Sequence, residues 1–203
     1  MSFTPPLWKN LNLCFLGLLS TIKTKSLISL PPTPVPTTSV CIFASATASS
    51  DSVTAFSSPD ALAVACRDSG IDVLVTANNH TCDRGKKGII RTLDVLDSLK
   101  IAHTGTFRNK AEFEEHNLLV LSKNGISVGI LNYTYGTNSL PVPEPTIVNK
   151  INLNLMKQDI EKAKKTHLDK LIVVIHWGIE YQQKQNKNQE EVAQFLFDNG
   201  VDI

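Results

Sequence analysis

The sequence predicts a layered α/β domain over residues 57–203. Amphipathic helical patterns alternate there with short apolar runs rich in β-branched residues, which are typical of strands buried between layers. Hydrophobic residues make up 42% of the 203-residue chain, which is enough to bury a sizeable core. The 20 basic and 19 acidic side chains nearly cancel, so the composition argues against a nucleic-acid binder.

Residues 1–56 differ from the rest of the chain in composition. They contain only four charged side chains but six of the ten prolines. Each proline removes a backbone donor and favours extended geometry in the residue before it, so we expect this segment to be poorly ordered and separate from the domain. Its apolar run over residues 11–22 is shorter than the roughly 20 residues that cross a bilayer. This run indicates either a weak export signal or a partly buried segment.

The first half of the domain predicts two helices, each followed by a strand. The first helix is expected to begin at Ser58, an N-cap followed by proline, and to end at Gly70, a natural C-terminal stop. The apolar run over residues 71–75 then predicts a strand that is covered on both faces. Apolar residues at helical spacing predict a second helix over residues 85–99, and residues 101–103 predict a short strand.

The second half of the domain predicts a hairpin followed by further alternation. Residues 118–121 and 126–133 are β-rich and flank Asn124-Gly125, a dipeptide that favours tight hairpin turns. After a proline-rich loop, the pattern is helix, strand, helix and the opening of a strand, over residues 154–167, 171–175, 188–199 and 201–203.

Two of the expected strands stop abruptly at polar residues. Asn78, Asn79 and His80 follow the first of them, and His176 follows the strand before the last helix. Polar sites of layered α/β domains form beyond the carboxyl ends of their central strands, so we expect these residues to lie close together. Each histidine alone favours a hydrogen-bonded structural role. Two such endings at one edge favour a metal or catalytic site about as strongly as a structural role.

Two segments resemble motifs of the CapA family of bacterial poly-gamma-glutamate capsule-biosynthesis proteins. Residues 78–85 (NNHTCDRG) resemble its Asn-Asn-His and Asp-x-Gly element, and residues 176–181 (HWGIEY) resemble its His-Trp-Gly-x-Glu element. Residues 189–201 resemble the helix that leads into its last strand, so the resemblance covers about residues 57–203. It implies the layered α/β sandwich of the calcineurin-like metallophosphoesterases.

The resemblance also implies that the sandwich is incomplete at both ends. The family's early Gly-Asp and Asn-Leu-Glu elements have no counterpart in residues 1–56, and its Gly-His-x-Pro-His element has none after residue 201. We therefore expect this chain to be a fragment of a CapA-type protein, with a first segment that is foreign to the family.

The resemblance implies functional roles for individual residues. Asn79 and His176 match metal ligands of the metallophosphoesterase superfamily, and His80 matches a general acid that acts on the substrate or its leaving group. The implied cofactor is a divalent metal of the Mn, Zn or Fe class. Tyr133, Tyr135, Gly136 and Asn138 resemble a family loop near the site or, more simply, a turn that ends a strand. The residues expected to orient the ligands or contact substrate are Asn78, Asp83, Trp177 and Glu180.

The function implied by the resemblance is capsule biosynthesis with a hydrolase-like metal site that is impaired in this chain. The implied partner is an anionic surface polymer or the machinery that makes it, rather than nucleic acid. The implied location is the cell envelope or another place outside the cytoplasm, and the resemblance is compatible with membrane association. A cytoplasmic location is the alternative. The second function class is a non-catalytic remnant or interaction module that keeps the α/β fold without metal.

Overall fold

The computed structural model describes residues 14–15, 39–42, 55–179 and 181–203. In chain order the strands are β1 (Cys14–Phe15), β2 (Ser39–Ile42), β3 (Ile71–Val75), β4 (Ala102–Thr104), β5 (Thr106–Phe107), β6 (Leu119–Lys123), β7 (Ile126–Thr134), β8 (Ile147–Val148) and β9 (Lys170–His176). The helices are α1 (Asp60–Asp68), α2 (Gly85–Ser98), α3 (Lys110–His116), α4 (Leu153–Lys164) and α5 (Lys187–Asp198).

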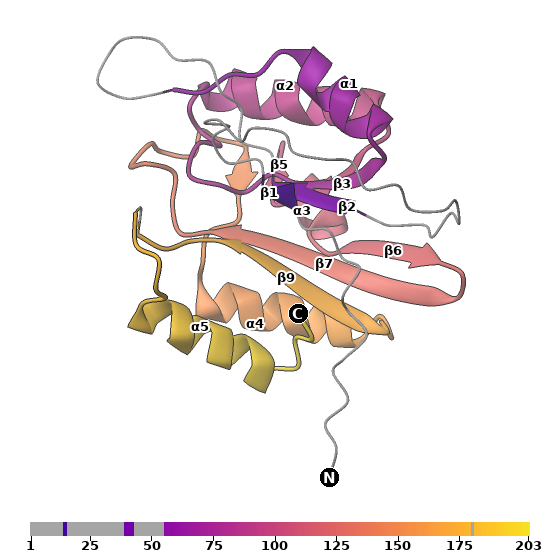
Figure 1. Ribbon diagram of the computed structural model, residues 1–203, viewed down its shortest axis with the longest axis vertical. Helices are drawn as coiled ribbons and strands as arrows, with labels where there is room; N and C mark the ends of the chain where they lie inside the picture. Colours follow the sequence, from indigo (N-terminus) through magenta and orange to yellow (C-terminus); the bar gives the residue numbers. More distant parts are fainter. Residues whose placement is uncertain (1–13, 16–38, 43–54, 180) are drawn as a thin grey trace, which may run out of the picture.

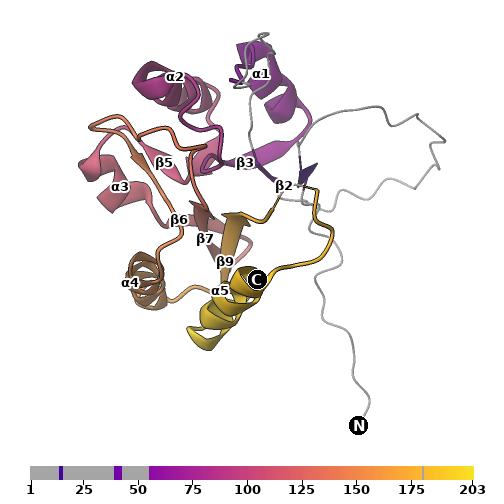
Figure 2. The same ribbon diagram turned by 90° about the vertical axis from the view of Figure 1, so that its left-hand side faces the viewer.

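These elements form layers of helices, sheet, sheet and helices (Figure 1). The first sheet has the strand order β1-β2-β3-β4 with every pair parallel, and α1 and α2 lie on its outer face. The second sheet has the order β6-β7-β9, and α4 and α5 cover its outer face. Figure 2 shows the same stacking after a quarter turn. The predicted layered α/β sandwich is therefore confirmed.

The alternation of side chains along β3 explains why this strand is apolar on both faces. Val73 and Val75 point to one face and pack against Ile130 and Val174 of the second sheet. Leu74 points to the other face, where it joins a cluster with α1 and α2. Successive side chains of a strand alternate between faces, so a strand between two layers needs apolar residues at every position.

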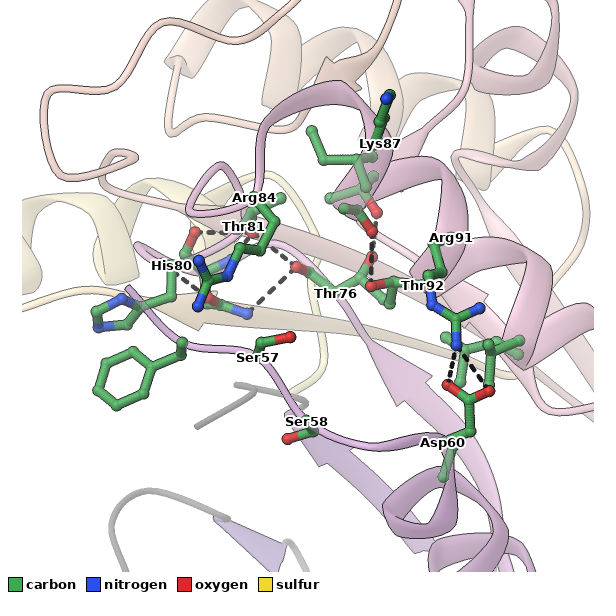
Figure 3. Close-up of a pocket in the computed structure, with 18 of the residues that line it drawn as sticks. Ser57, Ser58, Asp60, Thr76, His80, Thr81, Arg84, Lys87, Arg91 and Thr92 are labelled. Atoms are coloured by element: carbon green, nitrogen blue, oxygen red, sulfur yellow. Dashed lines mark hydrogen bonds and ion pairs between the residues drawn. The ribbon is translucent and has the colours of Figure 1, made fainter. Parts of the chain in front are cut away.

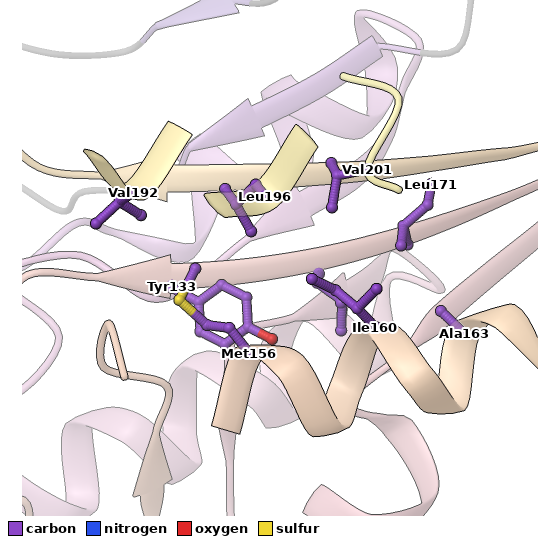
Figure 4. Packing of buried hydrophobic residues seen from close by; sticks show 9 residues of the cluster. Tyr133, Met156, Ile160, Ala163, Leu171, Val192, Leu196 and Val201 are labelled. Atoms are coloured by element: carbon purple, nitrogen blue, oxygen red, sulfur yellow. The ribbon is translucent and has the colours of Figure 1, made fainter. Parts of the chain in front are cut away.

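The second core lies between β7 and the helices α4 and α5 (Figure 4). Leu131 and Tyr133 of β7 are fully buried there, against Met156 and Ile160 of α4. The Tyr133 hydroxyl donates a hydrogen bond to Asp159 Oδ2 at 2.7 Å, so the polar end of the ring has a partner inside the core. Burial raises the pKa of Tyr133, and the nearby Asp159 raises it further.

The other expected helices and strands of residues 57–203 are confirmed, with ends that differ by a few residues, but residues 201–203, expected to open a strand, are not a strand in the structure. The hairpin around Asn124-Gly125 pairs Lys123 with Ile126, as its sequence predicts. Residues 201–203 lie beside β9, where the Asp202 amide donates to the Leu171 carbonyl at 2.9 Å.

Two features of this region were not predicted. One is α3, whose seven residues are too few to reveal an amphipathic period and bury no side chain. The other is the short antiparallel ribbon of β5 and β8, because two-residue strands carry no alternating pattern.

The first segment of the chain contributes β1 and β2, neither of which was expected. β2 pairs in parallel with β3, so it joins the same sheet as the domain. The remaining residues before 55, including most of the apolar run over 11–22, lie outside the described residues. Their poor order stays a prediction. Within the described ranges, no helix combines the length and apolarity needed to cross a membrane.

Candidate functional site

A buried asparagine in β7 joins the two polar strand ends. Asn132 Oδ1 accepts a hydrogen bond from the Ala77 amide, just after β3, at 2.7 Å. Its Nδ2 donates to the Val174 carbonyl of β9 at 3.0 Å. Asn132 is fully buried between the two sheets, so these bonds fix the end of β3 against the end of β9. Sequence reasoning missed this residue, although a polar side chain inside the apolar run over residues 126–134 was a visible signal.

Gly105 leaves the space that this asparagine occupies. Its φ of +111° lies in the region that favours glycine. A Cβ at this position would lie 2.0 Å from Asn132 Oδ1 and 2.8 Å from the Ala77 backbone nitrogen. A side chain at residue 105 would therefore displace the link between the strand ends.

Asn78 shapes the loop that carries the candidate residues. Its Oδ1 accepts a hydrogen bond from the His80 amide at 2.8 Å, and its Nδ2 donates to the Thr76 carbonyl at 3.3 Å. The Thr81 hydroxyl donates to the same Thr76 carbonyl at 2.9 Å. Side chains that bond to nearby backbone stabilise tight turns, so Asn78 holds His80 in place by its contacts to the loop.

His80 and Asp83 form a hydrogen-bonded pair at the beginning of α2. His80 Nδ1 lies 2.8 Å from Asp83 Oδ2, and the Asp83 side chain is 4% exposed. The Phe56 amide donates to the same carboxylate oxygen at 2.7 Å, and the Phe56 ring meets the imidazole edge-on at 4.2 Å. A carboxylate on Nδ1 orients the ring and favours the tautomer with its proton on Nδ1. Among the described residues nothing bonds to His80 Nε2, so that nitrogen is the one placed to exchange a proton.

Asn79 is buried and tied to the loop after β7. Its Nδ2 donates to Asn138 Oδ1 at 3.2 Å, and the Nδ2 of that residue lies 3.4 Å from His80 Nδ1. Within the described part of the chain, Asn79 Oδ1 accepts no hydrogen bond. This amide oxygen is the atom that a hard divalent ion would take.

His176 is the last residue of β9 and faces the same edge. Its backbone carbonyl accepts from the Tyr135 amide at 2.9 Å, and its ring stacks on the Tyr135 ring at 5.9 Å. Burial lowers the pKa of His176, and the charge of His80 lowers it further. The loop after β7 therefore touches both histidine segments, through Asn138 and Tyr135.

The two other predicted residues of the second motif contribute differently. Trp177 packs against the apolar cluster between β7, α4 and α5. This contact is structural, and a role for Trp177 at the site stays a prediction. Glu180 lies outside the described residues.

The donors at this edge do not make a complete metal site by themselves. In residues 55–179 and 181–203, and in the short strands before them, no group of three His, Cys, Asp or Glu is arranged to hold an ion. Asn79 and His176 supply two donors, whereas divalent metals in proteins take four or more ligands. No chemical step is therefore assigned to a metal.

A pocket of about 310 Å³ opens on the other side of His80 (Figure 3). It lies between the segment of residues 56–60 and the face of α2 that carries Arg84, Lys87 and Arg91. Asn79 and His176 do not line it. His80 is thus shared between the pocket and the edge of the two sheets.

Comparisons with known proteins show the family to which the chain belongs. The model of the family described as bacterial capsule synthesis protein PGA_cap matches residues 38–203. The chain belongs to this family. The resemblance expected from residues 78–85 and 176–181 is confirmed, and the match begins at residue 38, ahead of the boundary predicted at residue 57.

Two curated relatives carry related names. The chain is 30% identical over 144 residues to the capsule biosynthesis protein CapA of Bacillus anthracis, over 68% of this chain and 34% of that protein. It is 27% identical over 139 residues to the PGA biosynthesis protein CapA of Bacillus subtilis, over 68% of this chain and 36% of that protein. The chain thus spans about a third of the length of these relatives.

Solved structures give more distant likenesses. An NAD nucleotidase of Haemophilus influenzae has a TM-score of 0.44 and 18% identity, over 64% of this chain and 23% of that chain. A putative 5'-nucleotidase from Staphylococcus aureus has a TM-score of 0.46 and 13% identity, over 82% of this chain and 35% of that chain.

Proposed function

We propose that this chain is a domain that acts on poly-γ-glutamate during capsule biosynthesis, with His80 as its proton-transfer group. The observation that carries the proposal is the His80–Asp83 pair, with its 2.8 Å bond at the beginning of α2, inside the segment that matches the capsule-synthesis family. The names of the two Bacillus relatives support the polymer as substrate class. The cell envelope is the location that follows from such a substrate.

The role of His80 follows from its hydrogen bonds. Asp83 holds Nδ1 and stabilises the imidazolium, while Nε2 is free to give a proton to a leaving group or to take one from an attacking group. Imidazole suits this exchange because it titrates near neutral pH. Asp83 acts through His80 and is a positioning residue.

The metal expected from the family resemblance keeps the status of a prediction. Asn79 Oδ1 and His176 are the donors that we propose for it, and further ligands must come from outside the described residues. A divalent ion there would polarise a phosphoryl or carbonyl oxygen.

A non-catalytic binding module is the second candidate function. The observation that favours it is the lack of a three-residue metal group among the described residues. The two candidates differ in one respect: a catalytic domain needs the proton on His80, whereas a binding module needs only the shape and charge of the surface.

Surface polymer in cells tests the proposal. In the organism that makes this protein, His80→Gln should reduce poly-γ-glutamate on the cell surface by at least about tenfold, because a positioned acid or base contributes about 100-fold or more. His116→Gln is the matched control, because His116 is exposed at the end of α3. Protein amounts are compared by immunoblot. Unchanged polymer in His80→Gln cells, or no such polymer in parental cells, would contradict the proposal.

A further inference from the structure

The pocket beside His80 has a cationic end that its own residues do not neutralise. Arg84, Lys87 and Arg91 line it, and Asp60 accepts two hydrogen bonds of 2.8 Å from Arg91; among the residues that the structure describes, Arg84 and Lys87 have no carboxylate partner. The Arg84 guanidinium makes one long contact, 3.4 Å to the Ala55 carbonyl.

The placement of Arg84 distinguishes it from the other cations. Figure 3 shows its side chain pointing across the pocket toward the segment that carries Ser57, on the same side as His80. The Lys87 amine points away from that segment. Arg84 is therefore the cation placed to meet a ligand in the pocket, with Lys87 adding positive charge at the rim.

The remaining lining is mixed, with hydroxyl side chains such as Ser57 and Thr92 beside apolar ones such as Val95, which suits a ligand with both polar groups and methylenes. Val95 is half-buried on α2 beyond His80, whereas Ala63 and Leu96 behind it are each 1% exposed and belong to the core between α1 and α2. A volume of about 310 Å³ is near the lower limit of small-ligand sites, about 300 Å³. A site of this size holds a short piece of a polymer rather than a folded partner.

We propose that this pocket binds a short stretch of the γ-glutamyl chain, with Arg84 pairing a carboxylate and the methylenes lying toward Val95. The inference rests on the proposed function and adds to it the subsite that holds the substrate. A guanidinium binds carboxylate with two parallel hydrogen bonds, which gives orientation as well as attraction. A chain held this way passes His80, where the proton would be exchanged.

Binding of a fluorescent γ-glutamate oligomer to the purified full chain tests the pocket. Arg84→Gln should weaken binding by about tenfold or more, because hydrogen bonds between charged groups contribute more than neutral ones. Lys86→Gln removes the same charge two residues further along the chain, outside the pocket lining, so the affinity of this variant should stay within about twofold of the parent. Arg84→Lys keeps the charge without the planar fork and should lose an intermediate amount. Melting temperatures of all variants show that they fold.

Three results would overturn the pocket assignment. The first is that the parent chain does not bind the oligomer. The second is that Arg84→Gln and Lys86→Gln lose equal affinity for it. The third is that inorganic phosphate displaces the oligomer when both are present at the same concentration of negative charge. Loss of polymer in His80→Gln cells together with any of these rejects the pocket and leaves the proposed function standing. Unchanged polymer in those cells rejects the proposed function whatever the binding result.

Discussion

Gly105 and Asn132 form a contact on which the position of the site depends. Gly105→Ala should lower the free energy of unfolding by about 3 kcal/mol or more, because it combines an unfavourable φ with a backbone and side-chain clash. Gly125→Ala is the matched control, since Gly125 has a φ of +79° but nothing within 4 Å of an added Cβ. We expect it to cost about 1–2 kcal/mol. Urea denaturation of both variants measures the difference, and equal losses would contradict the role given to Gly105.

Asp159 is a buried carboxylate whose ionisation opposes folding. Burial raises the pKa of Asp159, and the hydrogen bond from Tyr133 offsets only part of this effect. From the ordinary carboxyl pKa up to the raised one, the folded chain holds a proton that the unfolded chain has lost, so stability falls as pH rises. Asp159→Asn removes this loss of stability at higher pH, because asparagine does not ionise. The amide oxygen of the new side chain can still accept the hydrogen bond from the Tyr133 hydroxyl.

The stability of Asp159→Asn relative to the parent should therefore increase from acidic to neutral pH. Urea denaturation of the two proteins at several pH values gives this difference directly. A difference that does not change with pH would show that Asp159 has the same pKa in the folded and unfolded chains.

At the scale of elements, α5 depends on Asn186, the N-cap residue that precedes it. The Asn186 side chain accepts from the Gln189 amide at 3.0 Å, and the Gln189 side chain accepts from the Asn186 amide at 2.9 Å. Asn186→Ala should cost about 1 kcal/mol, because the Gln189 amide loses its acceptor. Asn188→Ala, at an exposed position in the first turn, should cost nothing. Similar unfolding midpoints for the two variants would argue against the capping box.

The elements that could be predicted are those whose own residues carry a repeated signal. The strand over residues 71–75 is apolar at every position because it is covered on both faces. The hairpin is marked by Asn124-Gly125. By contrast, β5 pairs with β8 some forty positions later, and their pairing depends on contacts between distant residues that no local pattern records.

At the scale of the whole molecule, the sequence placed His80 and His176 at the ends of two strands, and the structure brings both segments against the loop after β7. The link through Asn132 was not predicted, because a single asparagine within a strand has no local consequence. The pocket was not predicted either. It forms between residues 56–60 and α2, which meet only in the folded chain.

The two donors proposed for a metal lead to a further test. Because Asn79 and His176 are fewer than the ligands a divalent ion takes, we expect the purified chain to retain well under one metal per chain after dialysis. Metal analysis by mass spectrometry, with an Asn79→Ala, His176→Ala double variant as control, measures this. One tightly held ion per parent chain that is lost in the double variant would contradict the expectation. It would mean that the remaining ligands come from outside the described residues.

The most direct test of the functional site is the polymer made by cells that carry Asp83→Asn. This change keeps the shape of the side chain but removes the charge that holds His80. Asp97→Asn makes the same change in a second His–Asp pair, where Asp97 Oδ1 of α2 lies 2.9 Å from His103 Nε2 of β4. We predict that surface poly-γ-glutamate falls by at least about tenfold in Asp83→Asn cells and stays near the parental amount in Asp97→Asn cells, at equal protein levels. Equal amounts of polymer in both would contradict a catalytic role for the edge that carries His80.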